Sequence, residues 1–465
     1  MVSILGANSA SGDYEVSNSL RFDDGSSAYL SRTQTAGNRR TWTWSGWIKR
    51  GVIDTRQNIL SAGNDGNDES HFRFDATGYL RFKESTGNSP EFLLDTNALF
   101  RDPAAWYHFV VAVDTTQSTD SDRIKIYVNG SQITSFNSPN YPSQNYDTRW
   151  NNNSQVTYLG MNVPDYRDYY DGYMTEVNFV DGSQKAPTDF GEFNDNGVWI
   201  PKKYSGSYGT NGYFLQFKQT GTSQNASGIG ADTSGQGNHF AVSGIAGTDI
   251  TTDTCTNNYC TLNSARGAIG SDSSNSTLSE GNLKSTGNNG DYKQCEGTMF
   301  PESGKWYWET LIVSDGSDAG AIGIQRSGLA IGAYPGKTAN GYGYDSSGSG
   351  SKIHNNSRDT SYGSSFAAND IIGTLLDLDN GTLTFYKNNS SQGQAYSGIT
   401  SSLGWGFGFG DAYGTVIVVN FGQEGSFAGN KTASGNSDAN GYGDFFYSVP
   451  SGYYALNTKN LAEFG

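Results

Sequence analysis

The sequence contains few of the residues on which helical cores, disulfide frameworks and polyelectrolyte binding depend. Only 16% of its 465 residues are charged, and it has 10 prolines, 4 methionines, 4 histidines and 3 cysteines. No window of about 12 residues places apolar side chains at the i, i+3, i+4 and i+7 positions of an amphipathic helix. No apolar run approaches the roughly 18 residues of a membrane span. These absences argue against a helical bundle, a disulfide-stabilised domain and a membrane-inserted protein.

The balance of charge excludes a further class of partner. The chain has 30 basic residues against 46 acidic ones, a net charge of −16 and a pI near 4.6. Such a protein repels phosphate backbones and anionic bilayers, so we predict no nucleic-acid partner and no insertion into membranes. Asn, Ser, Thr and Gly dominate the polar residues. This composition suits a hydroxyl-rich ligand, and it equally suits a merely soluble, loop-rich surface.

Cysteine is too sparse to define a metal centre. Cys255 and Cys260 have four residues between them and no histidine pair nearby, so they do not match a zinc motif. The spacing allows a disulfide between them, and the odd third residue, Cys295, equally fits three reduced thiols. The first 16 residues lack the basic region and apolar core of a secretory signal peptide, so none is predicted.

What the chain does have is aromatic residues and glycine: 29 Tyr, 24 Phe, 9 Trp and 61 Gly. This composition favours aromatic strands joined by tight turns. In Thr41–Ile48 the alternation places Trp42, Trp44 and Ile48 on one face and Trp47 on the other. Such segments recur at intervals of roughly 8–20 residues, the pattern of a β-sandwich or jelly roll. The predicted fold class is all-β, with two tandem antiparallel β-sandwiches.

Two Asn-Gly pairs, at 129–130 and 380–381, predict hairpins with two-residue type I′ turns. The first turn would bring Ile133 opposite Ile126. The second would bring Leu378 opposite Leu383 and leave a continuous apolar face along the hairpin, which specifies its register.

The second half of the chain carries a series of motifs from a known family. They are Lys305–Glu309 (KWYWE), Tyr342–Asp345 (YGYD), the hairpin at 380–381, Trp405–Asp411 (WGFGFGD) and a strand ending in VVNFG. The series resembles a SPRY domain, a bent β-sandwich that recognises partners through its loops. The resemblance implies ligand contacts at Tyr342, Tyr344, Asp345, His354, Asn355, Asp411 and Tyr413. Trp405 alternates with Phe407 and Phe409, which favours a place in the core.

The first half resembles a second family. Its motifs, in order, are Trp106–Asp114 (WYHFVVAVD), Ile124–Gly130 (IKIYVNG), Tyr158–Asn162 (YLGMN) and Asp171–Gly182 (DGYMTEVNFVDG). This order is similar to that of a laminin-G-like, concanavalin-A-like lectin sandwich. Lectins combine aromatic faces, which stack on sugar rings, with Asp and Asn that bind hydroxyls, often through calcium.

The lectin resemblance implies two loop sites. A sugar site would comprise Tyr166, Tyr169, Tyr170 and Asp171. A Ca2+ site would comprise Asn64, Asp65, Asn67 and Asp68. Both loops are equally compatible with turns that bind nothing, and no other cofactor is predicted.

Lectin-like sandwiches include glucan-cleaving enzymes, in which a Glu-x-Asp-x-x-Glu strand places its carboxylates on one face. No Glu in this chain is followed by Asp two positions later. Glu176 and Glu309 lie on predicted strands without an acidic partner on the same face, so we expect them to be solvated. His108 lies in an apolar strand and is expected to be a packed core residue. The chain also lacks a nucleophile elbow and a Walker loop. We therefore predict no enzyme, although a dispersed pair of acids would escape this search.

These observations divide the chain into four parts. They are an N-terminal arm (1–17), a lectin-like sandwich (18–217), a connector with local β-structure (218–279) and a SPRY-like sandwich with a C-terminal closing segment (280–465). With the Thr-rich junction DTCTNNYCTLN, the tandem is similar to virion accessory proteins of tailed phages of aquatic bacteria.

That resemblance implies a function and a location. We expect a non-enzymatic virion protein, a tail- or fibre-associated adhesin that binds host-surface glycans, present as a homo-oligomer or in many copies. It would be assembled in the host cytoplasm with other virion proteins and exposed on the particle surface. Two alternatives stay open: a head or tail decoration protein with purely structural contacts, and a polysaccharide depolymerase.

Overall fold

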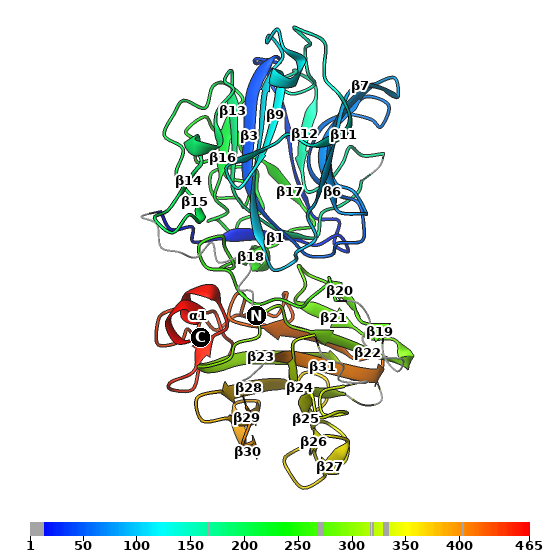
Figure 1. Cartoon of the computed structure of the whole chain (residues 1–465), viewed down its shortest axis with the longest axis vertical. Coiled ribbons are helices and arrows are strands. Elements are labelled where there is room, and N and C mark those ends of the chain that lie inside the picture. Colours follow the sequence, from blue (N-terminus) through cyan, green and yellow to red (C-terminus); the bar gives the residue numbers. More distant parts are fainter. Residues whose placement is uncertain are drawn as a thin grey trace. The chain divides into compact units, whose positions relative to one another are not determined.

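The structure is a computed structural model that describes residues 14–165, 167–266, 274–316, 318, 320–328, 334–400 and 404–465 (Figure 1). The chain folds into two compact units, and the division falls between Thr256 and Asn257. Each unit is a β-sandwich, so the predicted all-β class with two tandem sandwiches is confirmed. Within the described residues, no helix is long and apolar enough to cross a membrane.

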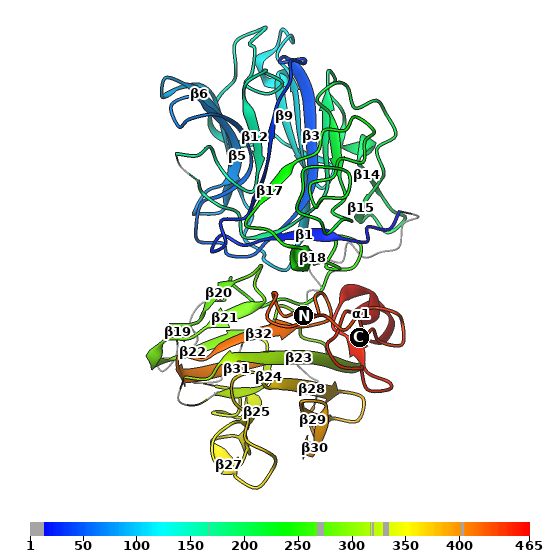
Figure 2. The same ribbon diagram turned by 180° about the vertical axis from the view of Figure 1, so that it is seen from behind.

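Two sheets that face each other form the first unit (Figures 1 and 2). Sheet A contains, in order, β10 (Ser131–Ile133), β9 (Ile124–Val128), β8 (Trp106–Asp114), β3 (Thr41–Arg50), β13 (Gly172–Asp181), β1 (Ser19–Phe22) and β18 (Ile250–Thr251), with β16 (Tyr213–Leu215) paired to β13. Sheet B contains β11 (Phe136–Asn140), β7 (Ser89–Leu99), β6 (Tyr79–Thr86), β5 (Glu69–Phe74), β4 (Gln57–Gly63), β12 (Val156–Leu159), β2 (Tyr29–Thr33) and β17 (Ala241–Ser243). The smaller elements are the hairpin β14 (Gly191–Phe193) and β15 (Trp199–Pro201) and the 3-10 turns η1 (Asp120–Asp122), η2 (Pro187–Asp189) and η3 (Gly247–Asp249).

The first core lies between the two sheets because their strands alternate apolar and polar side chains. Trp42, Trp44 and Ile48 of β3 are fully buried in it, while Trp47 packs in a separate cluster on the other side of sheet A. The predicted division of the β3 side chains between two faces is therefore confirmed. Burial of each such side chain stabilises the fold by about 1.5–3 kcal/mol.

The stretch predicted as a connector, 218–279, is divided between the two units. Its first part completes the first sandwich, because β17 pairs with β2, β18 pairs with β1, and Phe240 lies in the core. From Asn257 onward the chain belongs to the second unit, where Tyr259 bridges to Asn457. The physical reason is burial: Phe240 and Tyr259 each pack into a sandwich, where a linker would leave them in water.

Two further sheets form the second unit (Figure 2). Sheet C contains β19 (Ser274–Asn275), β22 (Asn289–Glu296), β31 (Trp405–Tyr413), β24 (Ala321–Arg326), β25 (Gly341–Asp345), β26 (Ser351–His354) and β27 (Ser357–Asp359). Sheet D contains β20 (Thr277–Ser279), β21 (Lys284–Thr286), β32 (Val416–Asn420), β23 (Lys305–Ser314), β28 (Ile371–Asp377), β29 (Thr382–Lys387) and β30 (Ser390–Tyr396), with β33 (Tyr454–Ala455) beside β23. The helix α1 (Thr458–Phe464) ends the chain. Trp405, Phe407 and Phe409 are buried in the second core, as the sequence predicted.

The two Asn-Gly hairpins close in different ways. At 129–130 both residues have positive φ and Ile133 pairs with Ile126, as a type I′ turn requires. At 380–381 only Gly381 has positive φ, and Leu383 pairs with Leu376 instead of Leu378. The predicted register of the second hairpin is therefore wrong by two residues. The connection is longer because Asp377 Oδ1 accepts a hydrogen bond from Asn380 N at 2.9 Å.

A shift of two residues leaves each side chain of β28 and β29 on its original face, because the side-chain period of a strand is two. The apolar face of this hairpin is consequently kept, and Leu376, Leu383 and Phe385 all lie in the second core. Leu378 also stays buried, and its N–H donates to Gly304 O at 2.9 Å. The connection is thus fixed by contacts outside the hairpin.

Glu176 and Glu309 are among the buried glutamates of the described residues, which corrects the expectation that they are solvated. Three of these glutamates show how a buried carboxyl is held. Glu176 lies at a bulge of β13 and accepts from Tyr14 Oη at 2.7 Å. Glu309 of β23 accepts from Phe446 N and Tyr447 N at 2.9 and 2.8 Å and thereby holds the C-terminal segment. The third, Glu84, accepts from Tyr146 Oη at 2.8 Å. Hydrogen bonds from such donors offset the free-energy cost of burying a carboxyl group.

The three cysteines are reduced and buried, so the structure contains no Cys255–Cys260 disulfide. Burial raises the pKa of Cys295 to about 12. His108 is a hydrogen-bonded core residue, as predicted: Trp199 Nε1 donates to its Nδ1 at 3.0 Å. Burial lowers the pKa of His108 to about 3, so its ring is neutral at pH 7.

Candidate functional site

A polar strip lies on the outer face of sheet B, the face turned away from the core. Strand β5 creates it by alternation: Phe72 and Phe74 are in the core, so Glu69, His71 and Arg73 lie on the opposite face. These three side chains are nevertheless buried. The strip therefore combines charge with exclusion of water, the condition under which polar contacts gain strength.

The neighbouring strands extend the strip in register. His71 lies opposite Ser61 of β4 and Lys83 of β6. Arg73 lies opposite Asn58 of β4 and Arg81 of β6. Directly opposed side chains in a sheet are about 5 Å apart at Cβ, so they form one contiguous surface.

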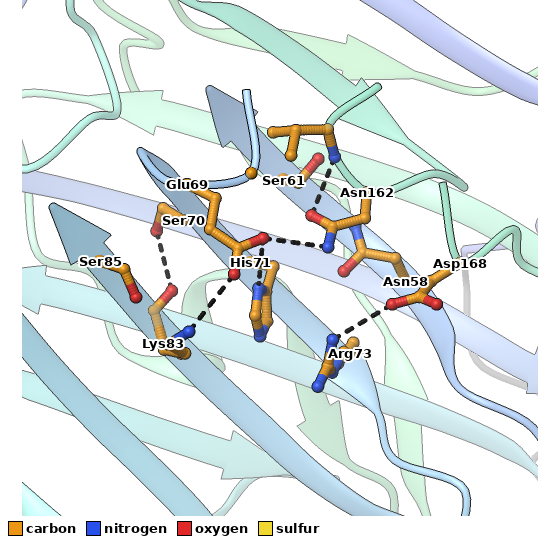
Figure 3. Close-up of polar contacts among 12 residues, drawn as sticks. Asn58, Ser61, Glu69, Ser70, His71, Arg73, Lys83, Ser85, Asn162 and Asp168 are labelled. Atoms are coloured by element: carbon orange, nitrogen blue, oxygen red, sulfur yellow. Dashed lines mark hydrogen bonds and ion pairs between the residues drawn. The ribbon is translucent and has the colours of Figure 1, made fainter. Parts of the chain in front are cut away.

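The connection between β12 and β13 covers this strip (Figure 3). Asn162 Nδ2 donates to Glu69 Oε2 at 3.0 Å, and Asp168 Oδ2 lies 3.2 Å from Arg73 Nη1. Met161 O accepts from Asn58 Nδ2 at 2.7 Å. Both ends of the connection are thus attached to the sheet, which explains why the strip is buried.

Glu69 and His71 form a coupled pair within the strip. Glu69 Oε2 lies 3.3 Å from His71 Nδ1. Burial raises the pKa of the Glu69 carboxyl, but the opposing effects of His71, Asn162 and Lys83 are larger together and lower it to about 2. Burial lowers the pKa of His71 to about 4, against the effect of Glu69. At pH 7 the carboxylate is charged and the imidazole neutral, so Nδ1 carries the proton and Nε2 offers a lone pair.

Three tyrosines lie at the side of the strip formed by β12 and β2. Tyr29 of β2 contacts Tyr158 of β12 edge to face, with ring centroids 6.1 Å apart. Tyr169, from the β12–β13 connection, stacks on Tyr29 at 6.4 Å. Tyr29 and Tyr169 are partly exposed. Such rings beside hydrogen-bonding groups are the elements from which sugar sites are built.

The predicted sugar-binding residues lie in different environments. Tyr169 belongs to the tyrosine group just described, and Tyr166 lies outside the described residues. Tyr170 is a core residue whose hydroxyl donates to Lys49 O at 2.7 Å, so its ring is not available to stack on a sugar. Asp171 is buried as well. Of the described residues predicted here, only Tyr169 offers a partly exposed ring.

The predicted calcium loop is occupied by contacts of its own. Asp65 Oδ1 accepts from Asn67 N and Asp68 N at 2.9 and 3.0 Å, and Asp68 Oδ1 lies 2.8 Å from Arg149 Nη2. Asn64 Nδ2 donates to Ser154 O at 2.9 Å. Calcium binding by Asn64, Asp65, Asn67 and Asp68 stays a prediction, and it would have to compete with these contacts.

A different group of carboxylates converges beside β1 and β13. Oxygens of Asp23, Asp24 and Asp171 lie within 4.8 Å of one another. Burial and the neighbouring Asp23 raise the pKa of Asp24. Carboxylate oxygens are the ligands that Ca2+ prefers, so among the described residues this group could hold such an ion.

The residues predicted for the second sandwich are also divided between core and rim. Tyr344 is fully buried, and Asp345 pairs with Arg358 at 2.9 Å. Asp411 is buried and accepts from Thr415 N at 2.7 Å. These three residues serve packing and structure, and are not free to contact a partner.

Four predicted residues remain nearer the surface of the second sandwich. His354 stacks on Tyr342 with centroids 4.0 Å apart and planes 8° apart, and both rings are partly exposed. Asn355 lies in the exposed turn that follows, with φ of +49°. Tyr413 is 44% exposed. These residues are accessible to a partner.

Comparisons with known families agree with this two-part organisation. Residues 23–188 match the family model of the concanavalin A-like lectin/glucanases superfamily, and residues 305–424 match that of the SPRY domain. The chain contains a lectin-like domain followed by a SPRY domain. Both resemblances drawn from the sequence motifs are therefore confirmed at the level of domains.

Individual relatives cover only parts of the chain. Ran-binding protein 10 of Danio rerio is 31% identical over 122 residues, which are 26% of this chain and 20% of that protein. The match thus spans about a fifth of the relative's length. Among solved structures, the SPRY domain of human HERC1 is 20% identical, with 30% of this chain and 87% of that chain covered and a TM-score of 0.27. A heptameric pentraxin from Limulus polyphemus is 14% identical, with 37% and 80% covered and a TM-score of 0.29.

The sequence contained a signal for the polar strip of the lectin domain that motif reasoning missed. In Glu69–Phe74 (ESHFRF) the polar positions alternate with Phe72 and Phe74. This pattern predicts a charged face on a strand whose other face is in the core. The sequence could not indicate that the β12–β13 connection packs on this strand. Asn162 and Asp168 are distant from Glu69 and Arg73 in sequence and contact them only in the folded protein.

Proposed function

We propose that the protein is a non-enzymatic adhesin that binds host-surface glycans through the outer face of sheet B in its lectin domain. The observation that carries the proposal is the polar strip around Glu69, His71 and Arg73, flanked by the rings of Tyr29 and Tyr169. The match of residues 23–188 to a lectin family supports it.

The arrangement suits weak, repeated binding. An aromatic ring that stacks on a sugar contributes about 0.5–1.5 kcal/mol beyond the area that it buries, and a neutral hydrogen bond about 1 kcal/mol. Such a site binds a single sugar weakly. Linked copies raise the effective affinity by a factor of about 10²–10⁴ when they engage a surface together. The proposal therefore includes display in several copies.

We further propose that the particle carrying these copies is a tailed-phage virion, with other virion proteins as partners. The tandem of a lectin and a SPRY domain with a Thr-rich junction supports this location. Electron microscopy of intact particles, with an antibody against the chain, tests it. Labelling of tail or fibre supports the adhesin, whereas labelling of the head favours a decoration protein. Particles that carry no copy of the chain would refute the virion location.

The glycan proposal is tested with the full-length protein coupled to beads and applied to a glycan array and to host cells. Tyr29→Ser is expected to reduce binding severalfold by removal of a stacking ring. Tyr413→Ser, an exposed tyrosine of the SPRY domain, serves as the matched control and is expected to leave glycan binding unchanged. Absence of binding at high valency would refute the proposal. Release of reducing ends from host envelope would favour a depolymerase instead.

A second candidate function concerns the SPRY domain. His354, Asn355 and Tyr413 are accessible on its surface, and one relative of the chain is named as a Ran-binding protein. This favours recognition of a protein partner. Chemical cross-linking in assembled particles, followed by a structure of the cross-linked pair, tests it. An interface of more than about 1,000 Å² at these residues is the expected result.

A further inference from the structure

Three side chains of the polar strip have hydrogen-bonding capacity that no described residue meets. Within the part of the chain that the structure describes, His71 Nε2, Arg73 Nε and Asn58 Oδ1 are buried without a hydrogen-bond partner. His71 is 1% exposed, and Asn58 lies directly opposite Arg73 across β4 and β5. Figure 3 shows the three side chains near Asn162 and Asp168 of the β12–β13 connection. An unmet buried polar group costs about 1–3 kcal/mol, so three on one surface require an explanation.

The unmet groups are two acceptors and one donor. His71 Nδ1 makes no aligned hydrogen bond either, but it lies 3.3 Å from the Glu69 carboxylate, which favours the proton on Nδ1 and leaves the lone pair on Nε2. Asn58 Oδ1 is an acceptor since Asn58 Nδ2 is already used by Met161 O. Arg73 Nε is a donor. A hydroxyl group both donates and accepts, so a pair of neighbouring hydroxyls can satisfy this set, whereas a carboxylate or sulfate, which only accepts, cannot donate to His71 or Asn58.

The charges of the strip also disfavour an anionic ligand, because each of its cations already has a carboxylate. Arg73 lies 3.2 Å from Asp168, Arg81 lies 2.7 Å from Asp95, and Lys83 lies 3.4 Å from Glu69. An acidic sugar would therefore lose its hydration without meeting an uncompensated positive charge, and this desolvation is costly. The net charge of −16 adds a repulsive long-range field.

Lys83 is the partly exposed neighbour of His71 on β6. It lies opposite His71 in the sheet, and 23% of its side chain is exposed. Its four-carbon stem is flexible, and its ion pair with Glu69 is long at 3.4 Å. A rotation of the Lys83 side chain would leave the contacts of Asn162 with Glu69 and of Asp168 with Arg73 intact, so the proposed entry runs past Lys83.

We infer that the strip binds a neutral sugar ring, through adjacent hydroxyl groups that meet His71, Arg73 and Asn58, and that Lys83 covers the entrance. This inference rests on the proposed glycan-binding function and specifies its ligand class. It predicts that the protein prefers neutral glycans to uronate, sialylated or sulfated ones, and that salt has little effect on binding.

The native full-length protein gives the first test. Neutral oligosaccharides and their uronate-containing and sulfated counterparts are compared on an array and by calorimetry at low and high salt. Binding to neutral sugars with little dependence on salt is expected. A preference for acidic glycans that weakens with salt would overturn the inference and leave the glycan-binding function standing. Absence of binding to every glycan would refute the proposed function itself.

Two substitutions give the second test. His71→Leu removes the acceptor and is expected to weaken binding about tenfold, the effect of about 1.4 kcal/mol. His239→Leu, outside the strip, is the matched control and is expected to bind as the native protein does. Melting temperatures of both variants show whether they fold.

Lys83→Ala separates the neutral from the anionic model even if His71→Leu does not fold. Removal of the Lys83 side chain is expected to leave the affinity for neutral sugars unchanged or raise it severalfold. A loss of about tenfold in Lys83→Ala would show that the lysine charge binds the ligand and would overturn the inference. A crystal structure soaked with the preferred neutral sugar that shows only water at His71 Nε2 would overturn it as well.

Discussion

The lectin domain and the SPRY domain share a layered architecture but use buried polar groups differently. In the SPRY domain, Glu309 receives three donors, from Tyr307 Oη, Phe446 N and Tyr447 N, and so attaches the closing segment to β23. In the lectin domain, His71 and Asn58 keep unmet acceptors on an outer face. A satisfied group such as Glu309 attaches a segment, whereas the unmet acceptors of the strip leave capacity for a further hydrogen bond. Both domains also hold groups of the other kind, such as Gln294 in the SPRY domain and Glu84 in the lectin domain.

The strongest test of this contrast is Glu309→Ala. It leaves three buried donors without an acceptor, so we expect the free energy of unfolding of the SPRY domain to fall by about 3 kcal/mol or more. Urea denaturation measures the loss, and hydrogen exchange should localise it to residues 436–455. Glu302→Ala, at an exposed position, is the control and should change stability by less than about 0.5 kcal/mol. Similar losses in both variants would contradict the assigned role of Glu309.

A second test uses pH. Burial raises the pKa of Glu84, Glu176 and Glu309 from 4.5 to about 7 in the folded protein. Each carboxyl thus binds its proton more tightly when folded, and its contribution to stability is full below about pH 4.5 and lost as the pH rises through about 7. We expect both domains to become less stable between about pH 4.5 and 7, as measured by urea denaturation at each pH. Glu69, with its pKa lowered to about 2, acts in the opposite direction and weakens the lectin domain as the pH falls from about 4.5 toward 2.

Glu309→Gln sharpens this comparison, because it should reduce the loss of stability of the SPRY domain between about pH 4.5 and 7 and leave that of the lectin domain unchanged. Burial also raises the pKa of Glu296, which accounts for the part of the loss that stays in the SPRY domain. Hydrogen exchange can follow the two domains separately in one sample. An unchanged pH dependence of the SPRY domain in Glu309→Gln would contradict the assignment.

The smallest effects are expected at the Asn-Gly turns 129–130 and 380–381. Asn129 has φ of +46° and its Oδ1 accepts from His108 N at 2.8 Å. Asn129→Ala should therefore cost about 2 kcal/mol from backbone strain and the lost hydrogen bond. Asn380 has no positive φ, and its side chain donates to Asp377 Oδ2 at 2.8 Å, so Asn380→Ala should cost only about 1 kcal/mol. Thermal denaturation of both variants compares the two losses of stability. A larger loss in Asn380→Ala than in Asn129→Ala would contradict the assignment of backbone strain to Asn129.

These turns also show how far local sequence determines structure. At 129–130 the sequence predicted turn type and register, and the contact from outside the hairpin, His108 N to Asn129 Oδ1, is compatible with that turn. At 380–381 the same Asn-Gly pair predicted the wrong register. Asn380 N donates a hydrogen bond to Asp377 Oδ1, and Leu378 N donates one to Gly304 O, so these two contacts fix a longer connection. The apolar face was still predicted correctly, as the period of two survives a shift of two residues.

The candidate site was less predictable than the fold. Tyrosines next to acids suggested the loop 166–171, but Tyr170 lies in the core and only Tyr169 is both described and partly exposed. Whether a tyrosine of this loop faces solvent depends on how the loop crosses the sheet, and a short irregular segment has no periodicity that would reveal it. The strip on β5 does have such periodicity, but its importance depends on contacts with Asn162 and Asp168.

By itself, the sequence determined the all-β class, the two domain types and the division of β3 side chains between two faces, because alternation and motif order are local properties of the chain. The tertiary structure alone decided that Glu176 and Glu309 are buried, that the segment around Phe240 completes the first sandwich, and that His71 lies beneath a distant connection. The physical reason is that burial and hydrogen-bond satisfaction depend on what packs against a residue, and those neighbours come from remote parts of the chain.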